Sequence, residues 1–497
     1  MTFDLSQIAA LAPVLIVALG GCLALVGETL VGRAHRSLLA VIAVAASLSA
    51  LAAAVGQWPA AGAGRSIFSG MWVVDRMSLA LDGIFAVTAA LTVLSADAFM
   101  REHDFDHGEL HALVLFASAG MMMVGHATHL LSLLIGIETM SLAAYILVAS
   151  WRRQPRGAEG ALKYLLLGAF ATGFLVYGTA LLYGGSGGAL DYVGLAARVP
   201  TAAAQPLFMI GVYFVLAGVL FKVAAVPFHT WAPDAYEGAP TPVTGFMAAG
   251  VKAAALGGLA RLCGSVLADP AVAGGHAGWV RVVGWIATAT MTLGNLAALR
   301  QENVKRMLAY SSIAHAGYLL VGVAALGLGL EGSQPALLFY LAAYAMTTLG
   351  MFAVVAWVGR RDDERLQVGE WSGLSGSRPG LALAMSVFLL SLAGVPPTGG
   401  FFAKFYLFRA AMQSPELYPL VIIAVLNSVV SVYYYLRLVV AMYFKEPLRP
   451  WELFSSKGLA AVVVISVLVV MALGLVPGPA VDLAADASAL GMPLAGR

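Results

Sequence analysis

Four ionisable side chains lie inside long apolar stretches of this 497-residue chain. They are Glu138, Lys222, Lys252 and Lys404, in the segments LLIGIETMSLAAY, VLFKVAAVPFHTW, FMAAGVKAAALGGL and GVPPTGGFFAKFYLF. A charge at the centre of a bilayer costs at least about 3 kcal/mol, so such residues usually face a partner or water. Burial lowers the pKa of a lysine and raises that of a glutamate, whereas an ion pair opposes both shifts. A lysine held between these influences can exchange a proton near neutral pH, which an arginine cannot. One glutamate and three lysines therefore predict a proton relay.

Two histidines are further candidates for the relay. His315 lies in the middle of another apolar stretch and is expected to be either a relay member or a hydrogen-bonded core residue. His229 follows Lys222 by seven residues and is expected at the cytoplasmic end of its helix, where it could admit protons. His126 and His129 flank a helix junction and would bind haem only with a second histidine pair, which we do not identify.

Other polar residues in or near the apolar stretches are expected to be structural. Asp82 and Asp97 flank the third stretch and are predicted to lie at the membrane interface. Lys163 and Arg437 lie near cytoplasmic helix ends, where long basic side chains reach the headgroups.

The composition is that of a helical membrane protein. Hydrophobic residues make up 60% of the chain and charged residues 11%, and the mean hydropathy is +0.87. The apolar residues come in blocks of roughly 20, the length of a helix that spans a bilayer. Helices satisfy their own backbone groups in lipid, and the alternating pattern of a β-barrel is absent. The chain is therefore expected to be an all-α polytopic membrane protein forming one membrane domain over 1–497.

Several other classes of function are disfavoured. A net charge of +2 suggests neither a nucleic-acid partner nor a polybasic lipid anchor. Cys22 and Cys263 are far apart in apolar surroundings, so they predict neither an iron–sulfur cluster nor a zinc site. The first apolar stretch opens with Asp4 and Gln7 and lacks a basic start, so it is not expected to be a cleaved signal.

Fourteen stretches are long enough to span a membrane. The least certain boundary lies between the fourth and fifth, which only the polar 126–129 separates. The predicted spans are 6–30, 36–58, 77–99, 109–126, 128–150, 158–184, 206–228, 240–263, 277–299, 303–329, 334–359, 380–411, 417–444 and 459–477.

Basic residues predict the orientation of the bundle. Sixteen follow odd-numbered helices and seven lie on the other side, so odd-numbered helices are expected to end in the cytoplasm and both termini to be periplasmic. The sixteen are Arg33, Arg36, Arg101, Arg152, Arg153, Arg156, Arg300, Lys305, Arg306, Arg360, Arg361, Arg365, Arg378, Lys445, Arg449 and Lys457. The seven are Arg65, Arg76, Arg198, Arg261, Arg281, Arg409 and Arg497.

Two predicted helices are interrupted, and the interruptions suggest an internal repeat. The seventh carries Pro227 after Lys222, and the twelfth carries 396–400, PPTGG, before Lys404. Proline removes a backbone donor and clashes with the preceding turn, and broken helices at corresponding positions indicate an ion path. The fifth and tenth helices also resemble each other in sequence. These offsets predict two five-helix repeats, helices 4–8 over 109–263 and helices 9–13 over 277–444.

Four motifs resemble the antiporter-like membrane subunits of respiratory complex I. They are FKVAAVPFHTWAPDAYEGAPTPVTGF at 221–246, KYLLLGAFATGFLVYG at 163–178, YSSIAHAGY at 310–318 and LSLAGVPPTGGFFAKF at 390–405. The resemblance covers helices 4 to 13, whereas the first three helices and the tail match only in hydropathy. The chain ends soon after the fourteenth helix, without the lateral helix of the largest such subunit, and the form of the 234–242 loop favours the subunit N branch.

The resemblance implies a fold and a role for each relay residue. It implies 14 helices, two inverted five-helix repeats and two proton half-channels that meet on a polar axis. Glu138 would be the ion-pair carboxylate and Lys222 its partner. Lys252 would be the central relay lysine, and Lys404 would lead to the periplasmic exit.

The favoured interpretation is a proton-translocating subunit of NADH:quinone oxidoreductase in a bacterial inner membrane. It implies no cofactor in this chain, with NAD, FMN, iron–sulfur clusters and quinone held by partner subunits. Subunits M and K of the complex would be its neighbours. The alternative is a subunit of a multisubunit cation/proton antiporter. A scaffold that moves nothing is disfavoured, because a scaffold does not need four buried charges.

Overall fold

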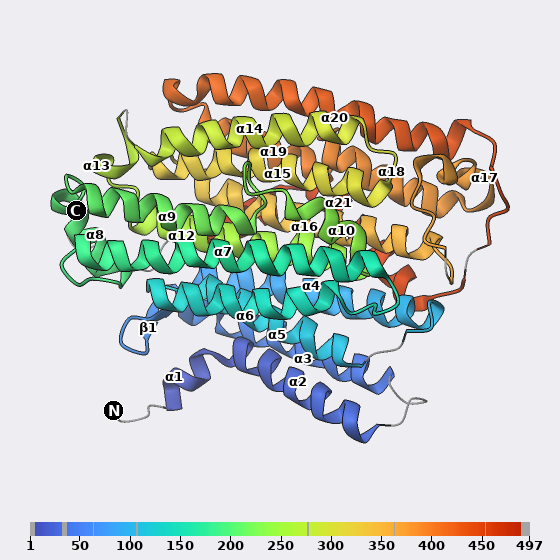
Figure 1. Cartoon of the computed structure of the whole chain (residues 1–497), viewed down its shortest axis with the longest axis horizontal. Coiled ribbons are helices and arrows are strands. Elements are labelled where there is room, and N and C mark those ends of the chain that lie inside the picture. The colour runs from blue at the N-terminus through green and yellow to red at the C-terminus, as the bar shows by residue number, and fades with distance from the viewer. Residues whose placement is uncertain are drawn as a thin grey trace.

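The fold is a bundle of roughly parallel and antiparallel helices in a computed structural model (Figure 1). The structure describes residues 5–31, 37–62, 64–105, 108–275, 278–361, 363–452 and 454–488. Arg33, Arg36 and Arg497, which were used to predict the orientation, lie outside these ranges.

Twelve helices among the described residues are long and apolar enough to cross a membrane. One of them, Thr241–Ser265, changes from α-helix to a π-helical turn in its middle. The twelve are built from α2 (Ala12–Leu30), α3 (Ser37–Gln57) with η2 (Trp58–Ala61), α4 (Arg76–Glu102), α5 (Glu109–His126), α6 (Leu130–Val148), α7 (Pro155–Gly185), α11 (Thr241–Phe246) with η3 (Met247–Val251) and α12 (Lys252–Ser265), α14 (Trp279–Leu299), α15 (Val304–Gly327), α16 (Ser333–Val358), η5 (Pro415–Leu417) with α20 (Tyr418–Phe444), and α21 (Lys457–Leu475).

Both predicted helix interruptions are present. The seventh predicted span, 206–228, holds α9 (Pro206–Lys222) and then leaves the helix around Pro227, and α10 (Trp231–Gly238) follows it. The twelfth span divides into α18 (Pro379–Ala393) and α19 (Gly399–Ala411). Gly394 ends α18 with φ +84°, a conformation that glycine adopts without steric cost. These pieces are each shorter than the twelve long helices, because the chain leaves the helical path between them.

The remaining elements are short. They are α1 (Leu5–Ala10), β1 (Arg65–Ile67), β2 (Trp72–Val74), α8 (Tyr192–Ala202), α13 (Pro270–Ala273), η4 (Val368–Trp371), α17 (Leu374–Ser377) and α22 (Gly478–Ala487). The two strands pair as an antiparallel hairpin. We call the end of the bundle that carries this hairpin the hairpin end, and the opposite end the α17 end (Figure 1).

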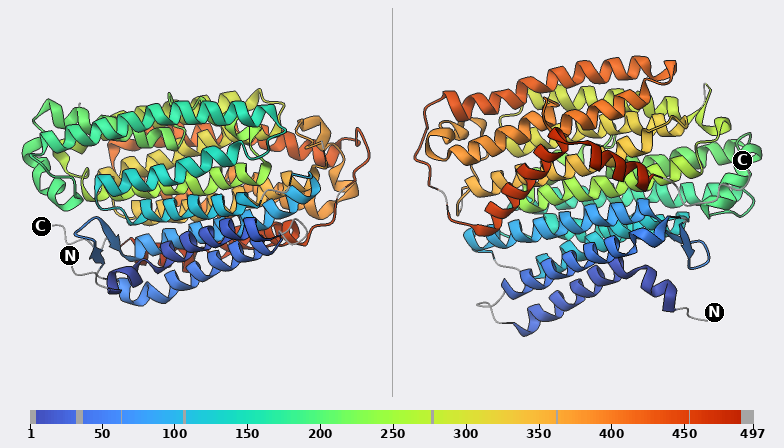
Figure 2. Two further views of the ribbon diagram at one scale, coloured as in Figure 1. Left: turned by 60° about the horizontal axis from the view of Figure 1, so that its bottom comes forward. Right: turned by 180° about the vertical axis from the view of Figure 1, so that it is seen from behind.

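The helices differ in how much of their surface the bundle covers. The most apolar stretch of Thr241–Ser265 is 100% buried and those of α15 and α16 are 94% buried, whereas those of α2 and α7 are 33% buried. In Figure 1, α2 and α3 form one edge and α20 the opposite edge, while α21 and α22 cross the back (Figure 2). The interior of the molecule is therefore built from α11–α12, α15 and α16.

The first and last described helices lie at the same end. Phe68 of the hairpin donates its N–H to Gln7 of the α1 region (3.1 Å). Asp486 of α22 pairs with Arg76 at the start of α4 and accepts from Trp58 (3.1 Å). Both helices thus contact the segment around the hairpin.

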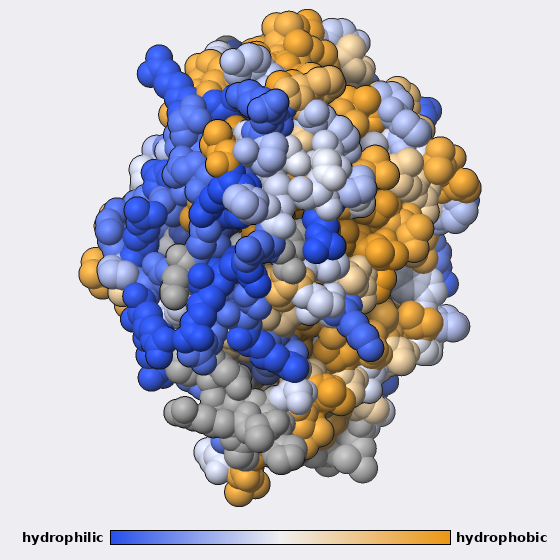
Figure 3. Space-filling view, turned by 90° about the vertical axis from the view of Figure 1, so that its right-hand side faces the viewer, coloured by the Kyte–Doolittle hydropathy of each residue, from blue (hydrophilic) through white to orange (hydrophobic). Residues whose placement is uncertain are grey.

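Charged residues gather at the α17 end. Figure 3 looks onto this end and shows a hydrophilic region beside hydrophobic surface. Arg449 pairs there with Glu370 (2.8 Å), and it also donates to Asp363. Burial by itself would raise the pKa of Asp363, but hydrogen bonds from Arg449 and from the Arg365 N–H lower it overall. Ion pairs of this exposure contribute little to stability, but they mark a face that contacts water.

Candidate proton-relay site

The three predicted lysines are buried in the bundle. Lys222 is 2% exposed at the end of α9, Lys252 is 2% exposed at the start of α12, and Lys404 is 5% exposed in α19. Glu138 of α6 is half-buried. A buried ammonium group needs hydrogen-bond acceptors, so the partners of each lysine define what the site can do.

Lys222 finds its acceptor in Tyr145. The ammonium donates to the Tyr145 hydroxyl (3.0 Å) and lies 5.3 Å from the ring centre of Phe221. As the last residue of α9, Lys222 also lies at the negative end of the helix dipole, which favours a cation.

Glu138 has a different partner from the one expected. Thr172 of α7 donates to its carboxylate (2.6 Å), and no ion pair joins Glu138 to Lys222 in the part of the chain that the structure describes. The two side chains are therefore not in direct contact in this structure, although Glu138 is the charged group that acts on Lys222, and their pairing in the relay stays a prediction. Tyr145 lies seven residues after Glu138, about 10 Å along the helix, and its hydroxyl takes the position next to the lysine.

Lys252 is bound by a neighbouring helix, as its small-residue surroundings require. Its ammonium donates to the backbone carbonyl and the hydroxyl of Ser312 in α15. The Tyr344 hydroxyl of α16 donates to the hydroxyl oxygen of Ser312 (2.9 Å). The centre of the Tyr344 ring lies 5.5 Å from the lysine nitrogen. The π-helical turn η3 ends at the residue before Lys252, and such turns are frequent at functional sites.

His315 lies one turn from Ser312 and bridges α16 and α20. Its Nδ1 is 2.8 Å from the Tyr340 hydroxyl and its Nε2 is 3.4 Å from the Tyr435 hydroxyl. Tyr435 also shares a hydrogen bond with Ser311 (2.5 Å). Each of these groups can donate or accept a proton, so the histidine is well placed to pass one between helices.

Lys404 donates hydrogen bonds to the backbone carbonyls at the end of α18. Its ammonium donates to the carbonyls of Leu392 (2.9 Å) and Ala393 (3.0 Å) and to the Ser428 hydroxyl (2.7 Å). The last carbonyls of a helix lack partners within it, so the interruption creates this cation site. The Tyr318 ring lies 4.9 Å from the nitrogen. Both broken helices therefore hold a lysine beside the interruption.

A small cavity links the surroundings of His315 to those of Lys404. Its volume is about 10 Å³, roughly the space that one water molecule needs. It is lined by His315, Tyr340, Tyr344, Thr347, Ser391, Leu392, Gly400 and Ala403. The Thr347 and Ser391 hydroxyls are hydrogen-bonded there (3.1 Å). A water molecule in this cavity would have polar partners from three helices.

His229 does not lie where the sequence suggested. The helix that begins at Pro206 ends at Lys222, and His229 lies in the interruption before α10 rather than at an end of the bundle. The expectation that it ends the helix at the cytoplasmic face is wrong, because α10 continues the path for eight more residues. His229 is half-buried and is not in hydrogen-bond contact with the predicted lysines among the described residues.

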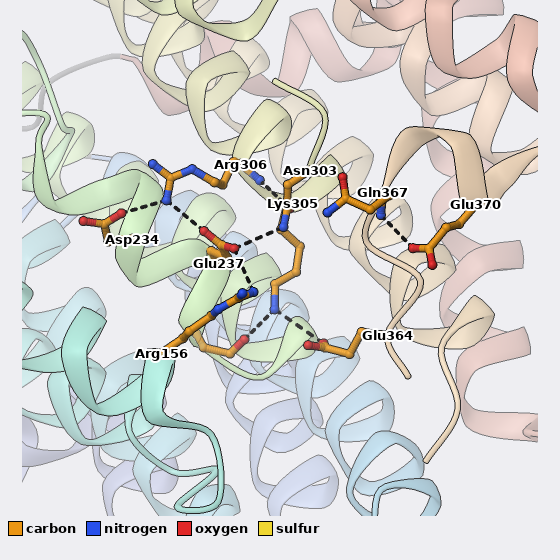
Figure 4. A network of polar contacts seen from close by, with 10 residues as sticks. Arg156, Asp234, Glu237, Asn303, Lys305, Arg306, Glu364, Gln367 and Glu370 are labelled. Carbon is orange, nitrogen blue, oxygen red and sulfur yellow. Dashed lines mark hydrogen bonds and ion pairs between the residues drawn. The ribbon is translucent and has the colours of Figure 1, made fainter. Parts of the chain in front are cut away.

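A polar network at the α17 end joins the segments around the first interruption to the second half of the chain (Figure 4). Arg306 of α15 pairs with Asp234 (2.7 Å) and Glu237 (2.8 Å) of α10. Lys305, which we counted as a loop residue, is 1% exposed; it donates to the Ala239 carbonyl (2.7 Å) and pairs with Glu364 (3.5 Å). The positions of these charges depend on contacts between distant segments, which hydropathy does not reveal.

A second buried charged cluster lies near the hairpin end, and the sequence did not indicate it. Asp82 is fully buried and its carboxylate is 2.9 Å from Nε2 of His126, so it does not face water or headgroups as an interfacial residue was expected to. Asp75 caps α4 and forms a two-fold pair with Arg261 of α12 (2.7 and 2.8 Å). Burial alone would raise the pKa of Asp75, but the adjacent guanidinium holds it below its ordinary value. Arg261 is thus a core residue rather than a loop cation.

No group of three or more His, Cys, Asp or Glu residues that could hold a metal ion occurs among the described residues. Cys22 is exposed and Cys263 is buried, and both are free thiols. What the described side chains offer is a set of buried groups that can exchange protons.

The arrangement agrees with a known class of membrane protein. The family described as NADH:quinone oxidoreductase/Mrp antiporter transmembrane proteins matches residues 127–431, which is more than half of the chain. The chain belongs to this family.

Relatives with high identity over nearly the whole chain include subunits N of NADH-quinone oxidoreductases. Subunit N 1 from Sorangium cellulosum is 43% identical over 501 residues, covering 96% of this chain and 98% of the relative. Subunit N from Trichlorobacter lovleyi is 43% identical over 469 residues, covering 94% of this chain and 93% of the relative.

Solved structures show the same fold. A chain of respiratory complex I from Thermus thermophilus, solved with bound aureothin, is 33% identical with a TM-score of 0.79, covering 95% of this chain and 98% of that one. A chain of the Mrp complex from Dietzia superposes with a TM-score of 0.83 at 22% identity, covering 98% of this chain and 97% of that one. The similarity to the Mrp complex chain shows a shared fold and nothing more.

Proposed function

We propose that this chain carries protons across the membrane as a subunit of NADH:quinone oxidoreductase, through Glu138, Lys222, Lys252, His315 and Lys404. The observation that carries the proposal is the burial of three lysines inside the bundle, each hydrogen-bonded to a hydroxyl group. Arginine in these positions would hold its proton permanently, whereas a buried lysine can release it. The electron chemistry takes place in partner subunits that bind NAD, FMN, iron–sulfur clusters and quinone.

The order of the path follows from the contacts. The Lys252 region connects through Ser312, Tyr344 and His315 to the cavity beside Leu392. The Leu392 carbonyl in turn accepts from Lys404. Glu138 and Lys222 form the other end of the path, with Tyr145 between α6 and α9. We assign no role to His229 in this path.

The chain is proposed to cross the membrane fourteen times, with the two interrupted helices counted as spans. Inverted repeats over 109–263 and 277–444 agree with how the helices pack. The first two helices of each repeat approach through glycine: Gly120 of α5 lies against the Met140 backbone in α6, and Gly294 of α14 lies against the Ala314 backbone in α15. A second correspondence is a lysine beside each interruption: Lys222 ends α9, and Lys404 of α19 binds the last carbonyls of α18.

The face of α6 that carries Glu138 supports contact with another subunit. Leu131, Ile135, Leu142 and Ile146 are 39 to 55% exposed on one stripe of the helix, and Glu138 follows the same spacing. A half-buried carboxylate at this position is costly against lipid. We propose that a neighbouring membrane subunit covers it, with subunits M and K as the expected neighbours.

The orientation gives a testable prediction. The basic bias puts the α17 end in the cytoplasm and both termini in the periplasm of a bacterial inner membrane. A reporter fused after Arg497 is expected on the periplasmic side, and one inserted near Arg361 on the cytoplasmic side. The fourteen-helix topology would be refuted if each reporter appeared on the side opposite to the one expected, or if the two termini lay on different sides of the membrane.

Tyr145→Phe tests the partner of Lys222. The change removes the hydroxyl that the ammonium binds, and a hydrogen bond to a charged group contributes about 1.5–3 kcal/mol. We expect fewer protons pumped per NADH in the assembled complex. Tyr164→Phe is the matched control, because Tyr164 packs edge-on against Tyr145 and its buried hydroxyl has no partner among the described residues. Equal pumping by both variants would remove Tyr145 from the path.

Co-purification tests the assignment to an oxidoreductase. A tagged form of the chain is expected to bring down hydrophilic subunits with flavin and iron–sulfur clusters, together with NADH oxidation activity. Recovery of small antiporter subunits without flavin would instead favour the multisubunit cation/proton antiporter.

A further inference from the structure

His126 and Asp82 meet inside the bundle, away from the buried lysines. His126 is the last residue of α5, Asp82 lies in the second turn of α4, and both side chains are fully buried. The imidazole Nδ1 is 2.8 Å from the Val73 carbonyl of β2 and the Nε2 is 2.9 Å from Oδ2 of Asp82. These two contacts determine how many protons the histidine and the aspartate hold between them.

The geometry fixes that number. A carbonyl oxygen only accepts, so Nδ1 of His126 must carry a hydrogen. Nε2 and the Asp82 oxygen then need one more proton between them, because a lone pair facing a carboxylate is repulsive. The pair is either imidazolium with carboxylate or neutral imidazole with carboxylic acid. In both forms it holds one proton more than a neutral histidine beside an ionised aspartate.

The environment of the pair can accommodate a change in that proton. The second carboxylate oxygen of Asp82, Oδ1, is buried and has no hydrogen-bond partner among the described residues. The neighbouring charges are Asp75 of the α4 cap and Arg261 of α12, which neutralise each other. Tyr192 of α8, whose hydroxyl also lacks a partner in the described chain, lies near Arg261.

The pair lies beside the helix that carries Lys252. Gly257 of α12 faces Leu81, the residue before Asp82, because a Cβ atom on Gly257 would be 2.8 Å from the Leu81 side chain. Gly257 is about midway along α12 between Lys252 and Arg261, which are nine residues or about 13 Å apart. Thr88 of α4, with a buried and unpartnered hydroxyl, contacts the Gly250 position in the π-helical turn next to Lys252.

We propose that His126 and Asp82 form a second proton-binding site, through which protons pass between Lys252 and the hairpin end of the bundle. The inference rests on the proposed function, since it extends the relay by one branch. When the pair releases its proton, it leaves a neutral imidazole with hydrogen on Nδ1 and an Asp82 carboxylate. When it takes up a proton, the Nε2–Oδ2 hydrogen bond forms again.

Asp82→Asn tests the proposal. The amide of asparagine can donate to Nε2 of a neutral His126, so the hydrogen bond and the shape are kept while the exchangeable proton is lost. We expect the complex to assemble and to oxidise NADH in uncoupled vesicles, but to pump fewer protons per NADH, with a loss as large as that of Lys252→Ala. Asp82→Glu keeps a titratable carboxyl group and is expected to restore part of the pumping.

The matched control is Asp486→Asn, which removes an ion pair at the same end of the bundle. It is expected to pump as the unmodified complex does. If Asp82→Asn does not assemble, the double variant Asp82→Leu/His126→Leu replaces both partners by apolar groups and is expected to show the same loss.

The outcomes separate this proposal from the relay itself. Normal pumping by an assembled Asp82→Asn complex, with Lys252→Ala impaired, would overturn the second site and leave the relay standing. Normal pumping by both variants would overturn both. Failure of Asp82→Asn and of the double variant to assemble would make the pair a structural element and would also overturn the proposal.

Discussion

Asp75→Ala is expected to destabilise the protein by about 3–5 kcal/mol, the cost of leaving a buried partner charge without compensation. Arg261 is 1% exposed and both of its terminal nitrogens donate to Asp75, so it would lose its counter-charge without access to water. The change also removes the side chain that caps α4 by accepting from the Ser78 N–H (2.8 Å). Arg261→Ala is expected to cost a similar amount.

Thermal unfolding and native gels of the detergent-solubilised complex measure this effect. Because the pKa of Asp75 is held below its ordinary value, the stabilisation is present at neutral pH and is lost as the pH falls through the lowered pKa. The control is Arg152→Ala, whose side chain is 74% exposed and whose pair with Glu109 is expected to contribute at most about 1 kcal/mol. Equal stability of the two variants would show that the buried pair is not needed to hold α4 against α12.

Lys252→Ala is expected to have the largest effect on transport. Positioned acid–base groups accelerate proton transfer by roughly 10²–10⁴-fold, so the share of pumping that passes through this chain should fall by a factor in that range. Its partner Ser312 would keep its hydrogen bond from Tyr344, so the local structure has a reason to persist. Proton uptake per NADH in reconstituted vesicles measures the loss, and an unchanged ratio in an assembled complex would exclude Lys252 from the path.

Local sequence patterns predicted most of the architecture. The predicted span 109–126 coincides with α5, and the predicted interruptions near Pro227 and at 396–400 are both present. These features depend on the length of an apolar run or on proline and glycine, which act within one or two turns. The buried positions of Lys222, Lys252 and Lys404 follow for the same reason, because each lies inside such a run.

The partners of those lysines could not be read from the sequence. Tyr145 is 77 residues from Lys222 and Ser312 is 60 residues from Lys252, so which helix faces which decides the contact. Tyrosine and serine are also common in membrane helices for reasons of packing. Glu138 and Lys222 have other direct partners for the same reason, since opposite charges alone do not fix where two helices touch.

Asp82 and Arg261 illustrate a second limit. Each lies close to the end of a predicted span, where a charged residue normally reaches water or headgroups. The hairpin and the end of α5 cover this site and supply the carbonyls of Val73 and Gly125 as acceptors. Burial at a helix end therefore depends on loop structure, which hydropathy does not report.

Lys252→Arg gives the most direct test that the buried lysines carry protons. Arginine keeps the positive charge but does not release its proton at accessible pH. The measurement is the number of protons pumped per NADH oxidised by the purified complex in vesicles, with assembly checked on native gels. Proton transfer through Lys252 predicts that the arginine variant loses as much pumping as Lys252→Ala. An arginine variant that pumps at the unmodified ratio while the alanine variant fails would contradict it, because the lysine would then act only as a fixed charge.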